Sequence, residues 1–76
     1  MERIKLIWDF RSPDAEKIAS HHVKHLVEYI TTKNIIDSNA SYEKISDMYW
    51  IAFIETDKSN MIELRDNLKP HRGETI

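Results

Sequence analysis

An unbroken run of apolar and aromatic residues near the middle of the chain constrains the fold most: it reads Met48-Tyr49-Trp50-Ile51-Ala52-Phe53-Ile54. An extended strand points successive side chains to opposite faces of its sheet. A strand that is apolar at every position therefore needs cover on both faces, which is typical of a central strand. We predict that residues 48–54 form such a strand in the middle of a sheet.

Length and composition exclude several classes of protein. The chain has 76 residues, no cysteine and one glycine. We expect a single small α+β domain over residues 1–76, of marginal stability, because a fold of about 60 residues buries only about 60% of the surface its unfolded chain exposes. Disulfides, thiol nucleophiles and thiolate zinc sites are excluded. Phosphate-binding loops need several glycines, so nucleotide-binding enzymes are excluded and no cofactor is predicted.

The charge balance argues against two kinds of partner. Eleven lysines and arginines against thirteen acidic residues give a net charge of −2, so no global field attracts nucleic acid or an anionic membrane. The strand aromatics also lack the glycine-spaced basic motifs of RNA-binding sheets. No apolar run approaches the roughly 18 residues of a membrane span, and the first residues lack the apolar stretch of a signal peptide. We expect a cytoplasmic protein that binds neither nucleic acid nor membrane.

Periodic patterns predict the first elements. Residues 3–10 alternate between apolar and polar side chains, as a strand does. Ser12 and Pro13 suit the cap and the first position of a helix. Apolar residues at three- and four-residue spacing carry that helix to about Lys33. A hairpin arm is expected within residues 34–46.

The remaining elements complete an α+β order. Asn60 and Glu63 have the spacing of a capping box, which predicts a second, shorter helix ended by Pro70. Strand, long helix, hairpin with a central strand, and short helix follow the ferredoxin-like order. That order ends with a fourth strand, and only residues 73–76 follow the helix, so we expect the final edge strand to be short or missing.

The central strand also suggests how the protein assembles. Two helices cover one face of a small sheet, so the other apolar face needs a different cover, and the simplest is a second copy packed sheet against sheet. We therefore expect a homodimeric binding or regulatory module rather than an enzyme. Alternate residues of the strand face opposite sides, so two sets of residues could form the interface. One set is Met48, Trp50 and Ala52, and the other is Tyr49, Ile51 and Phe53.

His22 is the main candidate for chemistry. It falls on the apolar face of the first predicted helix, where a half-buried imidazole can serve as acid, base or ligand contact. Asp9 and Tyr29 are its predicted partners. The alternative function is thus a cofactor-independent enzyme or small-molecule binder with a cleft around these residues. A core histidine whose ring nitrogens are hydrogen bonded is the competing interpretation.

The corner between the first strand and the helix is a second candidate site. Trp8 and Arg11 place an aromatic ring and a guanidinium there, which could hold a ligand. Arg11 could instead form a structural ion pair with Asp9 or Asp14.

A pair of histidines has the spacing of a weak metal motif. His21 and His25 are four residues apart, so their imidazoles can share a metal ion. Glu28 is a candidate third ligand, but no glutamate stands between the histidines and no further ligand is evident. We therefore predict no metal site.

Overall fold

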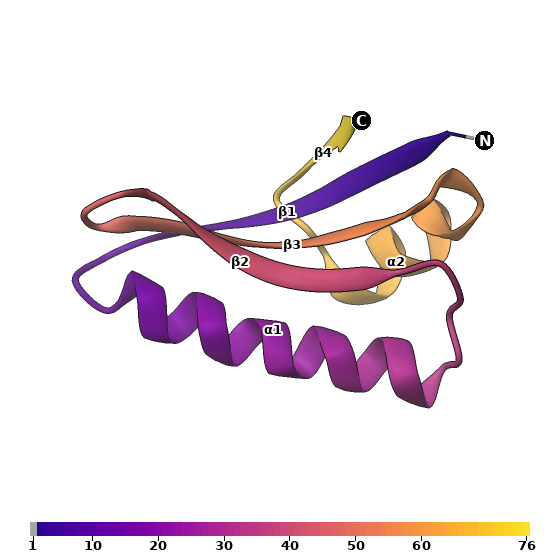
Figure 1. The fold of residues 1–76 in the computed structure, drawn as a ribbon, viewed down its shortest axis with the longest axis horizontal. Helices are drawn as coiled ribbons and strands as arrows, with labels where there is room; N and C mark the ends of the chain where they lie inside the picture. The colour runs from indigo at the N-terminus through magenta and orange to yellow at the C-terminus, as the bar shows by residue number, and fades with distance from the viewer. Residues whose placement is uncertain (1) are drawn as a thin grey trace.

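The chain forms an α+β fold of four strands and two helices (Figure 1). The computed structural model describes residues 2–76; Met1, the first residue of the predicted domain, lies outside the described part. The elements are β1 (Arg3–Arg11), α1 (Ala15–Thr32), β2 (Asn39–Ser46), β3 (Tyr49–Asp57), a 3-10 turn (Lys58–Asn60), α2 (Met61–Leu68) and β4 (Arg72–Thr75).

The strands form one sheet in the order β2-β3-β1-β4, and all neighbouring strands are antiparallel. β3 occupies the interior position that its apolar sequence predicts. It begins one residue later and extends further than expected, so Met48 lies in the turn before it. β2 supplies the predicted hairpin arm. The final strand, β4, is present as a short edge strand of four residues.

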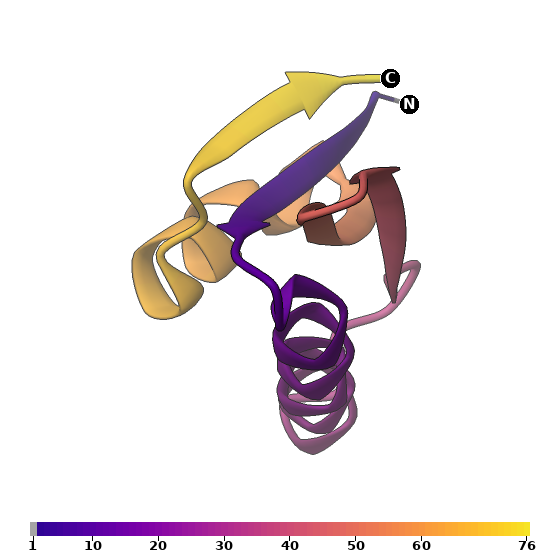
Figure 2. The same cartoon turned by 90° about the vertical axis from the view of Figure 1, so that its left-hand side faces the viewer.

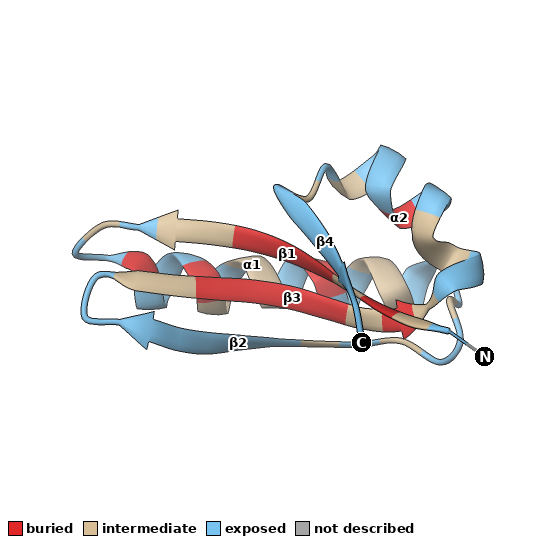
Figure 3. Cartoon of the chain, turned by 90° about the horizontal axis from the view of Figure 1, so that it is seen from above, coloured by how far each residue is buried: buried red, intermediate tan, exposed pale blue. Residues whose placement is uncertain are grey.

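Both helices pack on the same face of the sheet (Figure 2). The main core lies between them and the two central strands, where buried residues appear in red in Figure 3. It consists of Ile4, Leu6, Trp8, Ala19, Leu26, Ala52, Ile54 and Leu64. Burying a large apolar side chain contributes about 1.5–3 kcal/mol, which explains why Leu26 of the apolar stripe of α1 faces the sheet. Ile18 and Val27, which belong to the same predicted stripe, are exposed. Neither described helix is long and apolar enough to cross a membrane.

The helix-free face of the sheet has its own small apolar cluster. Ile7, Ile51 and Phe53 are only 1%, 3% and 8% exposed there. Tyr49 packs against this cluster, and the long side chain of Lys5 lies over Phe53 while its charged head reaches water. The Lys5 ammonium nitrogen lies 4.1 Å from the centre of the Phe53 ring. Ile7, Ile51 and Phe53 are thus already buried within the single chain, and the expected second copy on this face stays a prediction.

The start of α1 differs from the prediction. The helix begins at Ala15 rather than Pro13, and the residues before it form a turn. The Ser12 hydroxyl accepts a hydrogen bond from the Asp14 N–H at 3.2 Å, so it stabilises this turn instead of capping the helix. A serine can bond to nearby backbone in either geometry, and here the turn is preferred.

The predicted capping box at α2 is wrong. The Asn60 side chain makes no cap bond; it donates to the Ile36 carbonyl at 3.2 Å and to the Thr56 hydroxyl at 3.0 Å. Thr56 is fully buried, and its hydroxyl is hydrogen bonded both to Asn60 and to the Ser38 hydroxyl at 2.6 Å, which satisfies a polar group in the core. Asp57 supplies the cap one turn earlier, where its carboxylate accepts a backbone N–H at 2.9 Å.

Replacing Ile7 tests whether the helix-free face is buried in the single chain. We expect Ile7→Ala to lower the free energy of unfolding by about 2–5 kcal/mol, as for other buried isoleucines. Ile45→Ala is the control, because Ile45 is also an isoleucine on a strand but is 46% exposed. This substitution should lower the free energy of unfolding by less than about 1 kcal/mol. Denaturant titration measures both. Equal, small losses would show that this face is not part of the core.

Candidate functional site

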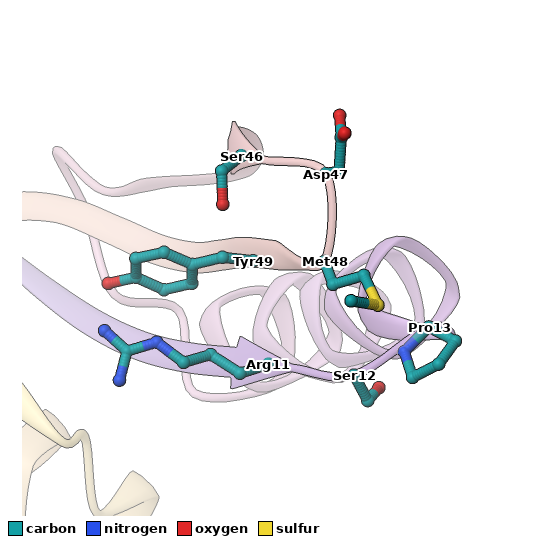
Figure 4. Close-up of a pocket in the computed structure, with 7 residues that line it drawn as sticks. All are labelled: Arg11, Ser12, Pro13, Ser46, Asp47, Met48 and Tyr49. Carbon is teal, nitrogen blue, oxygen red and sulfur yellow. The ribbon is translucent and has the colours of Figure 1, made fainter.

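A hollow lies at one end of the sheet, where the turn between β1 and α1 meets the turn between β2 and β3 (Figure 4). It has a volume of about 670 Å³. A hydrogen bond of 2.9 Å from the Ser12 N–H to the Met48 carbonyl joins the two turns. The lining residues are Arg11, Ser12, Pro13, Ser46, Asp47, Met48 and Tyr49.

The β2 to β3 turn leaves an apolar side chain over this hollow. A bulge between Lys44 and Ser46 ends the regular pairing of β2, and a tight turn follows. Met48 is therefore outside both strands and 57% exposed. In Figure 4 its side chain extends toward Pro13, whereas the Asp47 carboxylate points away. The turn thus gives the hollow an apolar wall.

Arg11 forms the opposite, cationic part of the hollow. Its guanidinium carbon lies 4.2 Å from the centre of the Tyr49 ring. Within residues 2–76, no carboxylate approaches this guanidinium within ion-pair distance, so the expected pairs with Asp9 and Asp14 do not form. A guanidinium stacked on a ring keeps the N–H groups at its edge available for an acceptor.

Trp8 does not share this site, which corrects the predicted ligand corner. Trp8 lies on the other face of β1, in the main core, and is buried. Its indole N–H donates to the Leu68 carbonyl at 3.1 Å and links β1 to the end of α2. Only Arg11 of the predicted pair lines the hollow.

A carboxylate fixes Tyr49 from its other end. Asp9 accepts hydrogen bonds from the Tyr49 hydroxyl at 2.5 Å and from Arg72 at 3.2 Å through each of two guanidinium nitrogens. Hydrogen bonding from Arg72 is the main reason that the pKa of Asp9 lies below its usual value, and partial burial opposes the shift. Tyr49 is thus held at its hydroxyl by Asp9 and on its ring face by Arg11, which makes this wall of the hollow rigid.

The predicted cleft around His22 is not formed. Asp9 faces the helix-free side of the sheet, whereas His22 packs on the helix side, with ring centres 4.9 Å from Trp8 and 5.5 Å from Phe10. Burial lowers the pKa of His22, so the ring stays neutral near pH 7. Its Nε2 atom is buried and has no hydrogen-bond partner among the described residues. His22 is therefore mainly a packing residue.

Tyr29 also lies away from the other two predicted cleft residues. Its hydroxyl donates to the Glu63 carboxylate at 3.5 Å, a contact between α1 and α2. Partial desolvation and the nearby charge of Glu63 raise the pKa of Tyr29. The three residues of the predicted cleft therefore serve three different places in the fold.

The predicted interface residues divide between the two faces of the sheet. Tyr49, Ile51 and Phe53 lie on the helix-free face, and Trp50 packs on the helix side. Ile51 and Phe53 are buried, so neither offers much surface to a partner. Met48 and Tyr49 instead line the hollow together with Arg11.

His21 and His25 do come together, as their spacing predicts. Their Nε2 atoms lie 3.0 Å apart on the outer side of α1. Glu28 does not join them, and the described residues contain no group of three or more potential metal ligands.

Sequence reasoning missed Arg72, because its contact with Asp9 joins residues 63 positions apart and no local pattern signals it.

Comparisons with protein-family models, curated proteins and solved structures gave no match for this chain. Its function is therefore inferred from the geometry of the site.

Replacing Asp9 tests the bonds that hold Tyr49. We expect Asp9→Asn to lower the free energy of unfolding at pH 7 by about 1–2 kcal/mol, because the hydrogen bonds to a charged group are lost. The folded-state pKa of Asp9 lies below 3.8, so its contribution is complete above pH 3.8 and disappears as pH falls through the lower, folded-state value. The difference between wild type and variant should therefore vanish in that acid range.

Denaturation between pH 7 and pH 2 measures this effect. Asp66→Asn is the control, because Asp66 is an exposed carboxylate whose contact is with the neighbouring Arg65. A difference between wild type and Asp9→Asn that stays constant with pH would show that the charge of Asp9 does not stabilise the fold.

Proposed function

We propose that this chain is a small binding module that holds an organic carboxylate with an apolar body in the hollow beside Arg11. The observation that carries the proposal is a guanidinium stacked on Tyr49, without an anionic partner among the described residues, in a hollow that the exposed residue Met48 also lines. In Figure 4 the guanidinium reaches along the Tyr49 ring, and Met48 lies at the other end of the hollow. A ferredoxin-like plan is part of the proposal, and the order of strands and helices supports it. A cytoplasmic location stays a prediction from the sequence.

The chemistry of the hollow favours a carboxylate over other ligands. A guanidinium presents two parallel N–H donors that match the two oxygens of a carboxylate. Met48 and Pro13 offer apolar surface for the remainder of the ligand, and the hydroxyls of Ser12 and Ser46 can donate further hydrogen bonds. The volume of about 670 Å³ falls in the range of about 300–1,000 Å³ that is typical of small-molecule sites.

A matched pair of ligands tests the proposal. We expect hexanoate to shift the backbone amide signals of Ser12, Ser46 and Met48 in an NMR titration of the full chain. Hexanamide, which has the same apolar body without the charge, should bind at least about tenfold more weakly, since a charge-assisted contact is worth about 1.5–3 kcal/mol. The Arg11→Gln variant should lose the preference for hexanoate.

Two further variants sharpen the test. Arg11→Lys should bind hexanoate more weakly than wild type, because a lysine keeps the charge but not the paired donors. Arg65→Gln is the control, since it removes the same charge from the exposed side of α2, far from the hollow. Equal binding of hexanoate and hexanamide, or unchanged binding by Arg11→Gln, would refute the proposal.

A second candidate function is self-association through the helix-free face of the sheet. Neither helix covers this face, and the strand register places charges of both signs on it, with Lys5 opposite Glu55 on one side and Glu74 on the other. Two copies related by a twofold axis can set the cations of one face against the anions of the other. The partner in this proposal is a second copy of the chain.

Sedimentation velocity at micromolar concentration tests the dimer. We expect a dimer at low salt that dissociates as ionic strength rises, because salt screens the charges between the two faces. Lys5→Glu should weaken the dimer, and Lys24→Glu, an exposed change on α1, should leave it intact. A monomer at every salt concentration would rule out this candidate.

A further inference from the structure

A second hollow, of about 310 Å³, lies on the surface of α1 and is separate from the carboxylate site. Three imidazoles line it together with Lys17 and Ile18. His21 and His25 meet across one turn of the helix, with Nε2 atoms 3.0 Å apart and ring centres 4.7 Å apart. Both side chains are on exposed positions of the helix, so the pair is open to solvent.

These two separations fit the geometry of a shared metal ion. Imidazole nitrogens bind first-row metals at about 2.0–2.1 Å, so two nitrogens 3.0 Å apart define an angle of about 94° at the ion. The ring-centre separation of 4.7 Å is compatible with this arrangement, and the 3.0 Å contact itself is a hydrogen bond between the two imidazoles. The rings therefore stand close to the positions of two neighbouring ligands.

We propose that His21 and His25 bind a divalent transition metal ion of tetragonal or octahedral preference, Cu²⁺ or Ni²⁺. Such ions place neighbouring ligands at about 90°, and imidazole is a ligand that both prefer. Tetrahedral Zn²⁺ would need the two nitrogens about 3.3 Å apart, so it fits the pair less well. Of these ions Cu²⁺ forms the most stable complexes with nitrogen ligands, so it is expected to bind most tightly.

Water or an external ligand completes the coordination, since no third group of the described residues joins the pair. His22 lines the same hollow, but its Nε2 atom is buried and unavailable at the surface. The ammonium group of Lys17, four residues before His21, opposes the positive charge of the ion. The site is therefore expected to bind with moderate affinity that depends on Lys17.

Titration of the full chain, without an affinity tag, with Cu²⁺ tests the site. Calorimetry should show one ion bound by the histidine pair, and electron paramagnetic resonance should show coupling to two imidazole nitrogens. His21→Gln and His25→Gln should each lower the affinity at least about tenfold, because each removes one of two protein ligands. His71→Gln is the control, since His71 lies in the segment before β4 and is not part of this hollow.

Two more measurements distinguish a specific metal site from nonspecific binding to surface histidines. Lys17→Gln should raise the affinity for Cu²⁺ several-fold, because it removes the repulsive charge. Ni²⁺ should raise the melting temperature of the wild type but not of the His21→Gln His25→Gln double variant, since an ion held across one turn stabilises α1. Unchanged affinity in the single variants, or tighter binding of Zn²⁺ than of Ni²⁺, would overturn the proposal.

Discussion

The structure depends on the antiparallel pairing of β1 with β3. This pair forms the centre of the sheet, and its side chains enter the main core on one face and the small cluster around Ile7 on the other. Both described helices pack on the first of these faces, and on the second the side chain of Lys5 lies over Phe53. The position of Tyr49 at the end of this pair in turn places the hollow at the end of the sheet.

The contact of Asp9 with Arg72 and Tyr49 connects the fold to the candidate site. It joins β1, β3 and β4, so it fastens the segment after α2 to the strands that line the hollow. The same carboxylate holds the tyrosine ring on which Arg11 stacks. A single half-buried acidic group therefore affects both the stability of the edge strand and the shape of the hollow.

Local patterns predicted the elements well because periodicity depends only on neighbours in sequence. The alternation of residues 3–10 and the apolar run ending at Ile54 correspond to β1 and β3. Contacts between distant residues could not be predicted. The cover of Phe53 by Lys5 depends on the register of two strands. Asn60 stands at the start of α2 as predicted, but its side chain bonds to Thr56 and Ile36 rather than to its predicted partner Glu63.

The candidate site was predicted only in part for the same reason. Arg11, Met48 and Tyr49 were each singled out, but for two different sites, and the sequence contains no sign that two turns would bring them together. His22 and Asp9 were predicted to lie together in one cleft. The strand instead places Trp8 and Asp9 on opposite faces of the sheet, and the His22 ring packs against Trp8.

The bulge between Lys44 and Ser46 has a consequence for how copies of this chain can meet. It interrupts the regular pairing of β2 with β3 and bends the edge strand, and the charges of Lys44 and Asp47 disfavour a flat approach by another strand. At the opposite edge, β4 offers only four residues. Both borders of the sheet are thus poor templates for continuous strand addition by another copy of the chain.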